Sequence, residues 1–308
     1  MLSVFIKNPI KSIFKNIDWV LFTSVILVSL AGLVTMNSFV DNSSFFERQT
    51  LWLSISILVF FIASFIDGRF LKNTRIIVTL FVISVGLLLL LFILGSVSKG
   101  AQSWFSFGAF SFQPADPIKL VVILLLSKYF SRRHIEIANI RHILVSGFYV
   151  SVIFILVFLQ PDFGSAIIIF FIWLGMVLVS GISKKHLLAV FLMAVIVFGG
   201  FWFFVFQPYQ KSRVINFIHP LTDIRGTGYN AYQSTIAVGS GQFFGKGIGY
   251  GTQSKLQFLP EYQTDFIFAA FAEEWGFTGV MLLFILYGII FWRLLKIAFR
   301  GGGNFEIL

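Results

Sequence analysis

Long apolar runs, separated by short polar or charged segments, dominate the chain from end to end. A membrane-spanning helix needs ~20 predominantly apolar residues. Windows of that kind predict helices at residues 19–36, 51–66, 75–95, 117–130, 142–160, 163–181, 187–206 and 266–292. The pattern therefore predicts an all-α fold, a polytopic membrane bundle of about eight transmembrane helices, in a single integral-membrane domain over residues 1–308.

Composition agrees with a bilayer as the solvent of this chain. Hydrophobic residues make up 57% and charged residues 12%, whereas soluble domains carry ~25% charged residues. Cysteine is absent, which excludes disulfides, thiolate nucleophiles and thiolate metal sites. The four histidines show no metal-ligand spacing, so a metal would need carboxylates. The formal net charge of +10 is expected to reflect membrane topology, with no nucleic-acid partner.

The distribution of basic residues predicts the orientation of the chain. With the N-terminus in the cytoplasm, 15 of the 23 Lys and Arg residues fall on the inner side and 8 on the outer side, as the positive-inside rule requires. The one long loop, residues 207–265, lies between the seventh and eighth predicted helices and then faces outward. Loops of this length are usually functional or disordered, and its many Phe, Tyr, Ile and Leu residues argue against disorder.

Asp265 stands at the predicted start of the last helix, at the outer membrane boundary. In one interpretation it is an N-terminal acid stabilised by the helix dipole, with Thr264 as the N-cap. In the other it is a functional carboxylate that accepts a proton or holds a divalent cation. The two interpretations are compatible.

Asp116 and Lys119 open the fourth predicted helix, and their spacing of three places them on one helix face. A local ion pair is the simpler interpretation. The predicted topology also places Lys119 near the outer boundary with Asp265, so the two helix starts are expected to share a polar site. Trp104, in the preceding outer segment, is either an interfacial aromatic or a substrate contact.

Glu273 and Glu274 are unusual because they fall inside the last predicted helix. They would lie ~12 Å below Asp265 along a helix with a rise of ~1.5 Å per residue, where an unpaired charge costs ~2.5–3.5 kcal/mol. Their positions around the helix axis differ. We expect Glu273 on the side of a polar cavity and Glu274 against another helix.

The segment from 226 to 251 is rich in glycine, which permits tight turns and a close backbone approach to a ligand. Together with Lys211, Arg213, Lys246 and Lys255, it would suit a diphosphate at the membrane surface. The alternative is a solvated loop without a ligand. No strand is predicted before this segment, so a dinucleotide-binding fold is excluded.

Six short segments of the chain resemble the motifs of one known family. They are Ala101–Trp104, Gln113–Lys119, Gln160–Ala166, Gly228–Ser234, Gly245–Gly247 and Leu259–Ala269. In order and spacing they are similar to the RodA/FtsW/SpoVE (SEDS) family of peptidoglycan polymerases. The Asp18–Trp19 start and the Phe258–Glu261 stretch most resemble RodA.

The resemblance implies a peptidoglycan glycosyltransferase that polymerises lipid II into glycan strands during cell elongation and cell-shape maintenance. It implies a multi-pass protein of the bacterial inner membrane, with a cytoplasmic N-terminus and an active site on the outer face. The implied partners are lipid II, a class B penicillin-binding protein and other membrane proteins of the elongation complex.

The same resemblance implies roles for individual residues. The family's essential aspartate falls on Asp265, as general base or cation ligand. Its loop tryptophan, helix lysine and loop arginine fall on Trp104, Lys119 and Arg213, which are expected to bind or orient the substrate. Supporting roles are expected for Asp116, Gln233, Lys246 and Glu273. No cofactor is firmly implied, and Mg²⁺ or Mn²⁺ at Asp265 stays open.

Two departures from the family pattern affect these expectations. Asp116 stands where the family has a glutamate, and Pro117 adds a second proline, so the acid reaches one methylene less far. The family has ten membrane helices, and the eight predicted here lead us to expect that the last two are absent. We then expect the chain to insert but to polymerise little, with Glu274 among the polar groups that would meet the absent helices.

Two other functions stay open. One is a flippase for a lipid-linked precursor, since polar residues within a helix bundle also mark transport paths. The other is a non-catalytic membrane scaffold for a penicillin-binding protein, which would not need Asp265.

Overall fold

The computed structural model describes residues 17–38, 43–98, 101–107, 110–131, 140–181, 183–219, 223–224, 226 and 228–308. By its internal packing the chain divides into two compact units. Unit 1 comprises Met1–Ile66 and Gly199–Lys296, and unit 2 comprises Asp67–Phe198 and Ile297–Leu308. A single domain over residues 1–308 stays a prediction.

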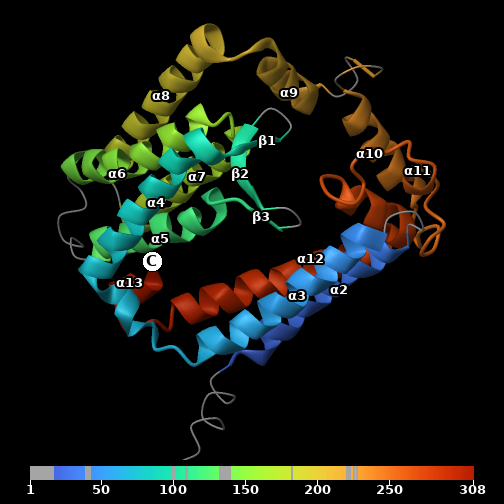
Figure 1. Cartoon of the computed structure of the whole chain (residues 1–308), viewed down its shortest axis with the longest axis horizontal. Helices are drawn as coiled ribbons and strands as arrows, with labels where there is room; N and C mark the ends of the chain where they lie inside the picture. Colours follow the sequence, from blue (N-terminus) through green and yellow to red (C-terminus); the bar gives the residue numbers. More distant parts are fainter. Residues whose placement is uncertain are drawn as a thin grey trace, which may run out of the picture. The chain divides into compact units, whose positions relative to one another are not determined.

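Unit 1 contains the first two long helices of the described chain and the last one (Figure 1). Its elements are α2 (Trp19–Asn37), α3 (Ser43–Ser64), the π-helical turn η2 (Phe201–Val205), α9 (Pro208–Ile218), α10 (Tyr229–Ser240), α11 (Thr252–Lys255) and α12 (Ile267–Ala298). Polar contacts join α2 to α12 at both ends of α2. Arg293 Nε donates to the two Asp18 carboxylate oxygens at 3.0 and 2.8 Å, and Ser38 donates to Glu274. The two helices therefore run antiparallel, side by side.

Unit 2 combines a helix bundle with a small sheet. Its elements are η1 (Gly68–Lys72), α4 (Thr74–Leu94), β1 (Ser96–Ser98), β2 (Ala101–Phe107), β3 (Phe110–Phe112), α5 (Ala115–Ser131), α6 (Ile140–Leu159), α7 (Phe163–Val179), most of α8 (Lys184–Gly200), and α13 (Asn304–Ile307). Aliphatic side chains from four helices, such as Leu88, Ile118, Ile153 and Ile169, form its buried core. The helices α4, α5, α6 and α7 therefore make up the body of this unit.

Polar residues mark where several helices begin. The carboxylates of Asp18 and Asp162 accept hydrogen bonds from Leu21 N and Ser165 N, both at 3.1 Å, at the starts of α2 and α7. The side chain of Asn73 caps α4 in the same way. Such caps satisfy N–H groups that the first helical turn leaves without intrahelical partners. The apolar runs thus begin at residues that favour a helix start.

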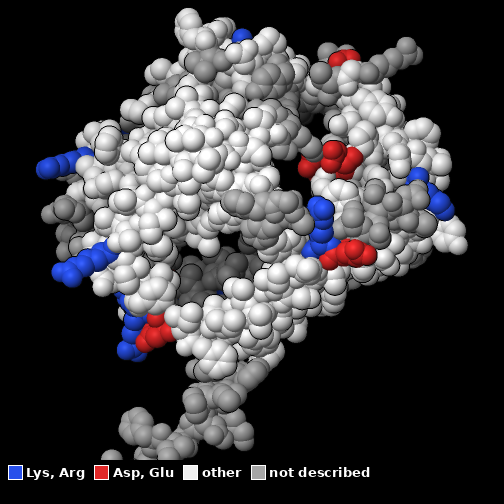
Figure 2. All heavy atoms as spheres, in the orientation of Figure 1, with Lys and Arg blue, Asp and Glu red and all other residues white. Residues whose placement is uncertain are grey.

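The eight predicted apolar windows fall, in chain order, on the helices α2 to α8 and α12. Six helices of the described chain are long and apolar enough to cross a membrane, and charged side chains are sparse on the face drawn in Figure 2. The helical membrane fold is confirmed, while eight crossings stay a prediction. α3 starts at Ser43 rather than at residue 51, because the polar Glu47 and Arg48 lower the hydropathy of turns that are still helical.

The apolar pattern does not predict the antiparallel sheet of unit 2, whose strand order is β1-β2-β3. Ser96 pairs with Trp104, and Phe105 pairs with Phe112. β1 and β3 have three residues each, which is too short for a clear alternation of apolar and polar positions, and the seven residues of β2 do not alternate strictly. The sheet places Trp104 on β2, between α4 and α5.

The long loop of residues 207–265 is about half helical in its described part. It contains α9, α10 and α11. The apolar residues of this segment show no clear helical period, so these short helices could not be predicted from the sequence. α9 starts at Pro208 behind a reciprocal cap between Gln207 and Gln210. Proline is favoured there because the first helical turn has no need of its missing N–H group.

The last helix, α12, is broken at Gly276, whose φ and ψ are 66° and −167°. Its 32 residues would extend ~48 Å at ~1.5 Å per residue, more than the ~30 Å of a bilayer core. Residues 277–298 alone are long enough to cross a bilayer, whereas residues 267–275 are mostly buried within unit 1. The structure thus removes the reason to place Glu273 and Glu274 deep in the bilayer.

Candidate functional site

The segment Gly241–Gly251, here called the glycine loop, is bonded through its backbone to α12 on both sides of the break. On the N-terminal side, the amides of Lys246 and Gly247 donate to α12 carbonyl oxygens, both at 3.0 Å. On the C-terminal side, the amides of Phe277 and Thr278 donate to loop carbonyl oxygens at 2.9 and 3.1 Å. The loop therefore satisfies backbone groups that a broken helix leaves unpaired.

Glycine is required where this loop and α12 touch. A Cβ on Gly245 would lie 2.1 Å from the carbonyl oxygen of Glu274, and a Cβ on Gly276 would lie 2.2 Å from the amide nitrogen of Gly245. Both glycines also have positive φ, at +81° and +66°, which residues with a Cβ rarely adopt. Close backbone contact therefore explains the glycines at these two positions.

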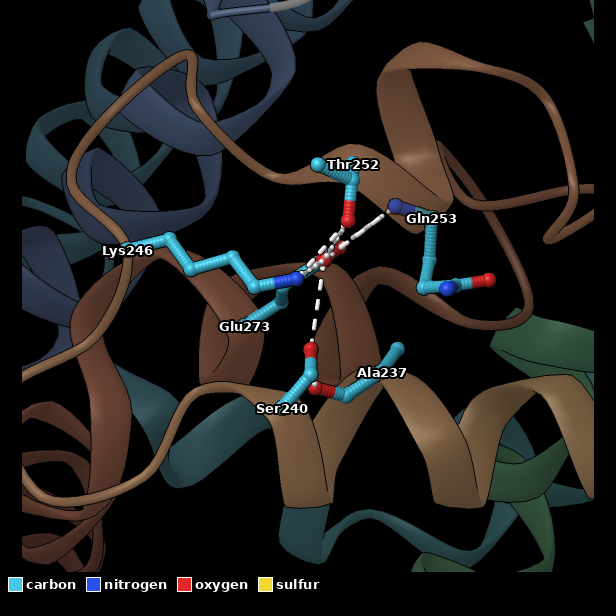
Figure 3. Close-up of polar contacts among 6 residues, drawn as sticks. All are labelled: Ala237, Ser240, Lys246, Thr252, Gln253 and Glu273. Carbon is cyan, nitrogen blue, oxygen red and sulfur yellow. Dashed lines mark hydrogen bonds and ion pairs between the residues drawn. The ribbon is translucent and has the colours of Figure 1, made fainter.

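Glu273 lies at the centre of this contact, with a fully buried side chain (Figure 3). Its Oε1 accepts hydrogen bonds from Lys246 Nζ at 2.7 Å and from Thr252 Oγ1 at 3.1 Å. The backbone N–H of Gln253 donates to both carboxylate oxygens of Glu273, at 3.1 and 3.2 Å, and the Ser240 hydroxyl donates to Oε1 at 3.3 Å. One carboxylate therefore joins α10, the glycine loop and α11 to α12.

Glu274 is buried as well, but it faces α2. It accepts hydrogen bonds from the Ser38 hydroxyl at the end of α2 and from Gly249 N, the latter at 2.8 Å. The expected contact of Glu274 with another helix is confirmed. The expectation that Glu274 would also meet helices beyond the chain stays a prediction, because both partners bind Oε1, and the buried Oε2 has no hydrogen-bond partner among the described residues. Glu273 faces polar groups, as expected, but they are fixed protein groups rather than a cavity.

The glycine loop has few groups available for a phosphate. Its amides at 246, 247 and 249 already donate to α12. The ammonium group of Lys246 is bonded to Glu273 and to Thr252, at 2.7 Å in each case. A diphosphate site would need amides or cations that are not already engaged. The geometry favours a structural role for the loop, and diphosphate binding by it stays a prediction.

Asp265 lies in a turn of residues 261–266 that leads into α12 at Ile267. The Glu261 carbonyl oxygen accepts from two amides of the turn, both at 3.1 Å, and Glu261 has a positive φ of 53°. The predicted helix start at Asp265 is therefore slightly early. The Thr264 hydroxyl donates to the Glu261 carboxylate at 2.9 Å, so the structure gives it a partner within the turn rather than the predicted capping role.

Buried neighbours fix this turn and leave Asp265 at the surface. Leu259 and Tyr262 pack with Ala237 of α10 and Ala269 of α12 in the small core of unit 1. Small side chains at such a contact let the elements approach closely. The Asp265 carboxylate is exposed, and it forms no hydrogen bond or ion pair within the part of the chain that the structure describes. It is a positioned carboxylate whose oxygens are available to a ligand.

Unit 2 holds Asp116 and Lys119 in the local ion pair that their spacing predicts, with Lys119 Nζ 2.8 Å from Asp116 Oδ1. Gln113 Nε2 donates to Asp162 Oδ2 at 2.6 Å and ties the start of α5 to the start of α7. Lys119 belongs to unit 2 and Asp265 to unit 1. The shared polar site of these two residues therefore stays a prediction.

The remaining predicted residues lie on four different elements. Trp104 is half-buried on β2, Gln233 lies on α10, and Lys255 ends α11. Arg213 belongs to α9, but its side chain lies outside the described part of the structure. Their roles in substrate binding stay predictions.

A divalent cation at Asp265 would need ligands from outside the protein. No group of three His, Asp or Glu side chains that could hold a metal occurs among the described residues. Mg²⁺ is commonly held by one or two carboxylates together with substrate phosphates. The exposed carboxylate of Asp265 fits such a role, and the cation stays a prediction.

Sequence reasoning missed Ser240, Thr252 and Gln253 as partners of Glu273. They lie 20 to 33 positions away from it, and hydroxyl or amide residues in a loop follow no period. One signal was available, because an acid inside an apolar helix needs polar partners when it is buried. That signal indicates that partners exist, but it does not identify them.

Known proteins resemble this chain over most of its length. Residues 12–308 match the cell cycle protein family FtsW/RodA/SpoVE. The chain is 33% identical to the peptidoglycan glycosyltransferase MrdB of Escherichia coli K12 over 280 residues, which are 91% of this chain and 75% of that protein. It is 34% identical to the stage V sporulation protein E of Bacillus subtilis over 278 residues, which are 89% of this chain and 75% of that protein.

Solved structures resemble it in fold. One, described as the structural coordination of polymerization and crosslinking by a peptidoglycan synthase complex, matches with a TM-score of 0.78 and 28% identity over 95% of this chain and 81% of that one. The rod shape determining protein RodA of Thermus thermophilus matches with a TM-score of 0.66 and 26% identity over 94% of this chain and 79% of that one.

Proposed function

The chain belongs to the FtsW/RodA/SpoVE family of cell cycle proteins, and from this membership we infer that it is a peptidoglycan glycosyltransferase. The observation that carries this inference is the match to MrdB, a protein named for that activity, at 33% identity over 91% of the chain. The helices that are long and apolar enough to cross a membrane make it a multi-pass membrane protein.

We propose that its substrate is lipid II, a disaccharide linked to a lipid through a diphosphate. A sugar hydroxyl attacks the anomeric carbon, the bond from that carbon to the diphosphate oxygen breaks, and the diphosphate leaves with the electron pair. Asp265 takes the proton of the attacking hydroxyl as general base. The leaving diphosphate is already anionic and needs cations more than a proton donor, which is the role proposed for Lys119 and Arg213.

The contrast between two acids supports Asp265 as the base. Its carboxylate is exposed on a turn held by buried neighbours, whereas the Glu273 carboxylate is fully occupied by protein donors. We assign Glu273 and Lys246 the task of positioning the loop that leads to Asp265. Trp104, Asp116 and Gln233 are proposed substrate contacts. As the alternative to the role of general base, Asp265 would hold Mg²⁺ or Mn²⁺, which would neutralise charge on the leaving group.

The proposed setting is the bacterial inner membrane, with the N-terminus in the cytoplasm and Asp265 on the outer face. The excess of basic residues on the predicted inner segments supports this orientation. We propose a class B penicillin-binding protein as partner, in the elongation complex. A resembling structure that coordinates polymerization and crosslinking in one complex supports such a partner.

A polymerisation assay tests this function directly. The purified chain, in proteoliposomes with its penicillin-binding partner, receives fluorescent lipid II, and the products are separated by length on a gel. Two expectations are opposed in this assay. The glycosyltransferase assignment predicts long products that a muramidase shortens, because that enzyme cleaves the glycosidic bonds of glycan strands, whereas the eight predicted helices lead us to expect little product. MrdB under the same conditions is the positive control. Strands from MrdB and none from this chain would contradict the assignment.

A further inference from the structure

The glycine loop carries apolar side chains that its own packing leaves exposed. Phe244 is 80% exposed and Tyr250 71%, and Phe243 and Ile248 are each about half exposed. These four residues are here called the loop tip. Single exposed hydrophobic residues are ordinary on protein surfaces, whereas four of them within one short loop, with the rings of Phe243 and Phe244 in contact, indicate a partner.

Backbone and ring contacts hold the loop tip in this exposed position. The Phe243 carbonyl oxygen accepts from Thr278 N at 3.1 Å. The Phe243 ring centroid lies 4.9 Å from that of Phe244 and 5.7 Å from that of Phe277. Tyr250 N donates to the Gly247 carbonyl oxygen at 3.1 Å. The Phe243 end of the loop tip is therefore fixed beside the break in α12.

That place is the start of a membrane-spanning segment. Residues 277–298 follow the break in α12 and suffice to cross a bilayer core of ~30 Å. Their first turns expose large apolar side chains, such as Phe277, Met281 and Phe284. Because the Phe243 ring lies beside that of Phe277, the Phe243 end of the loop tip continues this apolar surface at the level where the helix enters the membrane.

The polar groups of the glycine loop suit contact with lipid. Lys246 is its one charged residue, and its ammonium group is bonded to Glu273 and Thr252. Burial in hydrocarbon is costly for unpaired charges and for unsatisfied backbone groups, and α12 satisfies several of the loop amides. A tyrosine with an apolar ring and a polar hydroxyl favours the membrane interface.

We propose that the loop tip inserts into the boundary between headgroups and acyl chains, in the leaflet where residues 277–298 enter the bilayer. This interfacial anchor fixes the height of the glycine loop above the membrane. Through the contacts of Glu273 it also fixes the height of the loop region that leads to the Asp265 turn, where a lipid-linked substrate would arrive. Only that last consequence rests on the proposed function, and insertion can be tested without an activity assay.

The chain contains no cysteine, so a single introduced thiol is the only site that a thiol-reactive fluorophore can label. Phe244→Cys carries an environment-sensitive fluorophore in the full chain, reconstituted into vesicles of phosphatidylcholine and phosphatidylglycerol. Asn230→Cys, at an exposed polar position of α10, is the water reference. Phe284→Cys is the lipid reference. Tyr250→Cys repeats the measurement if the Phe244 variant does not fold, as judged by size-exclusion chromatography.

The expected result is a blue-shifted emission for the label at 244. Nitroxide lipids should quench this label several-fold more than the label at 230, and aqueous iodide should quench it several-fold less. Iodide quenching equal to that at 230 would overturn the anchor. Protection from both quenchers would also overturn it, since another part of the chain or a second copy would then cover the patch. Protection that arises only after addition of a penicillin-binding partner would assign the patch to that protein and overturn the lipid contact.

Discussion

Asp265 and Glu273 lie eight positions apart in the chain, yet their carboxylates are in opposite situations. Glu273 is buried and accepts hydrogen bonds from Lys246, Thr252, Gln253 and Ser240. Asp265 is exposed, and none of the described residues binds its carboxylate. A carboxylate with occupied oxygens holds a structure together, whereas one with available oxygens can take a proton or a cation. The more conspicuous acid in the sequence is therefore the architectural one.

The largest expected effect follows from removing the charge of Asp265. Asp265→Asn should slow strand synthesis by about 10²-fold or more, since general acid–base catalysis contributes ~10²–10⁴-fold. The thermal midpoint in detergent should not change, because the side chain loses no partner. Glu261→Gln, in the same turn, is the matched control and should keep both the rate and the midpoint. Normal strand synthesis by Asp265→Asn would remove this residue from the mechanism.

Gly276→Ala should separate the glycine loop from α12. The new Cβ would meet the Gly245 amide nitrogen at 2.2 Å, in a residue with a φ of +66°. Backbone strain of ~1–3 kcal/mol and a steric cost of ~1–3 kcal/mol combine to lower the free energy of unfolding by about 3 kcal/mol. Denaturant titration in detergent measures this loss.

Gly239→Ala is the control for that variant. A Cβ on Gly239 of α10 meets nothing within 4 Å, and alanine is the better helix former by up to ~1 kcal/mol. This variant should be as stable as the unaltered chain or slightly more so. Equal stabilities for the two alanine variants would show that the backbone contact at Gly276 is not needed.

Glu273→Gln should cost about 3 kcal/mol of stability, near the lower end of the ~3–5 kcal/mol found when one partner of a buried ion pair is removed. The lower end applies because the Lys246 side chain is 28% exposed and can turn toward water. Adding Lys246→Met should recover part of the loss, since no unpaired cation then remains. A double-mutant cycle measures the coupling, and additive losses would contradict the pairing.

The smallest expected effect concerns Asp18, whose carboxylate is less buried than that of Glu273 but, unlike that of Asp265, is paired with another of the described residues. Burial alone would raise the pKa of Asp18, but hydrogen bonds from Arg293 and Leu21 lower it on balance. Its contribution to stability is then present above the unfolded pKa of ~3.9 and is lost as the pH falls through the folded pKa. Acidification below pH ~4 should cost the unaltered chain up to ~1 kcal/mol more than Asp18→Asn. Parallel stability curves for the two proteins would contradict this.

The long apolar helices could be predicted from the sequence, because each apolar run must bury its backbone polar groups in a helix to enter a bilayer. The break at Gly276 could not. A glycine in an apolar helix is compatible with an unbroken helix, and only the approach of Gly245 from 31 positions away requires a positive φ. The sheet of β1, β2 and β3 was missed for a similar reason, since its register depends on pairing between short strands.

The candidate site was predictable in part. Asp116 and Lys119 form the pair that helical spacing predicts, because both partners are local. The sequence identifies Asp265 as an acid at a helix start. Its exposure could not be predicted, because it depends on the burial of Leu259 and Tyr262 in the core of unit 1. The surroundings of Glu273 were not predictable, since they are assembled from α10, α11 and a loop between them.

The contact of Gly245 with Gly276 also bears on genetics. Neither glycine has a side chain that could act on a substrate, yet replacement of either would push two backbones apart. A screen for mutants that fail to build their wall would therefore recover both glycines together with Asp265, and the phenotypes would look alike. Protein abundance in the same mutants separates them, because only the catalytic mutants should accumulate a normal amount of inserted protein.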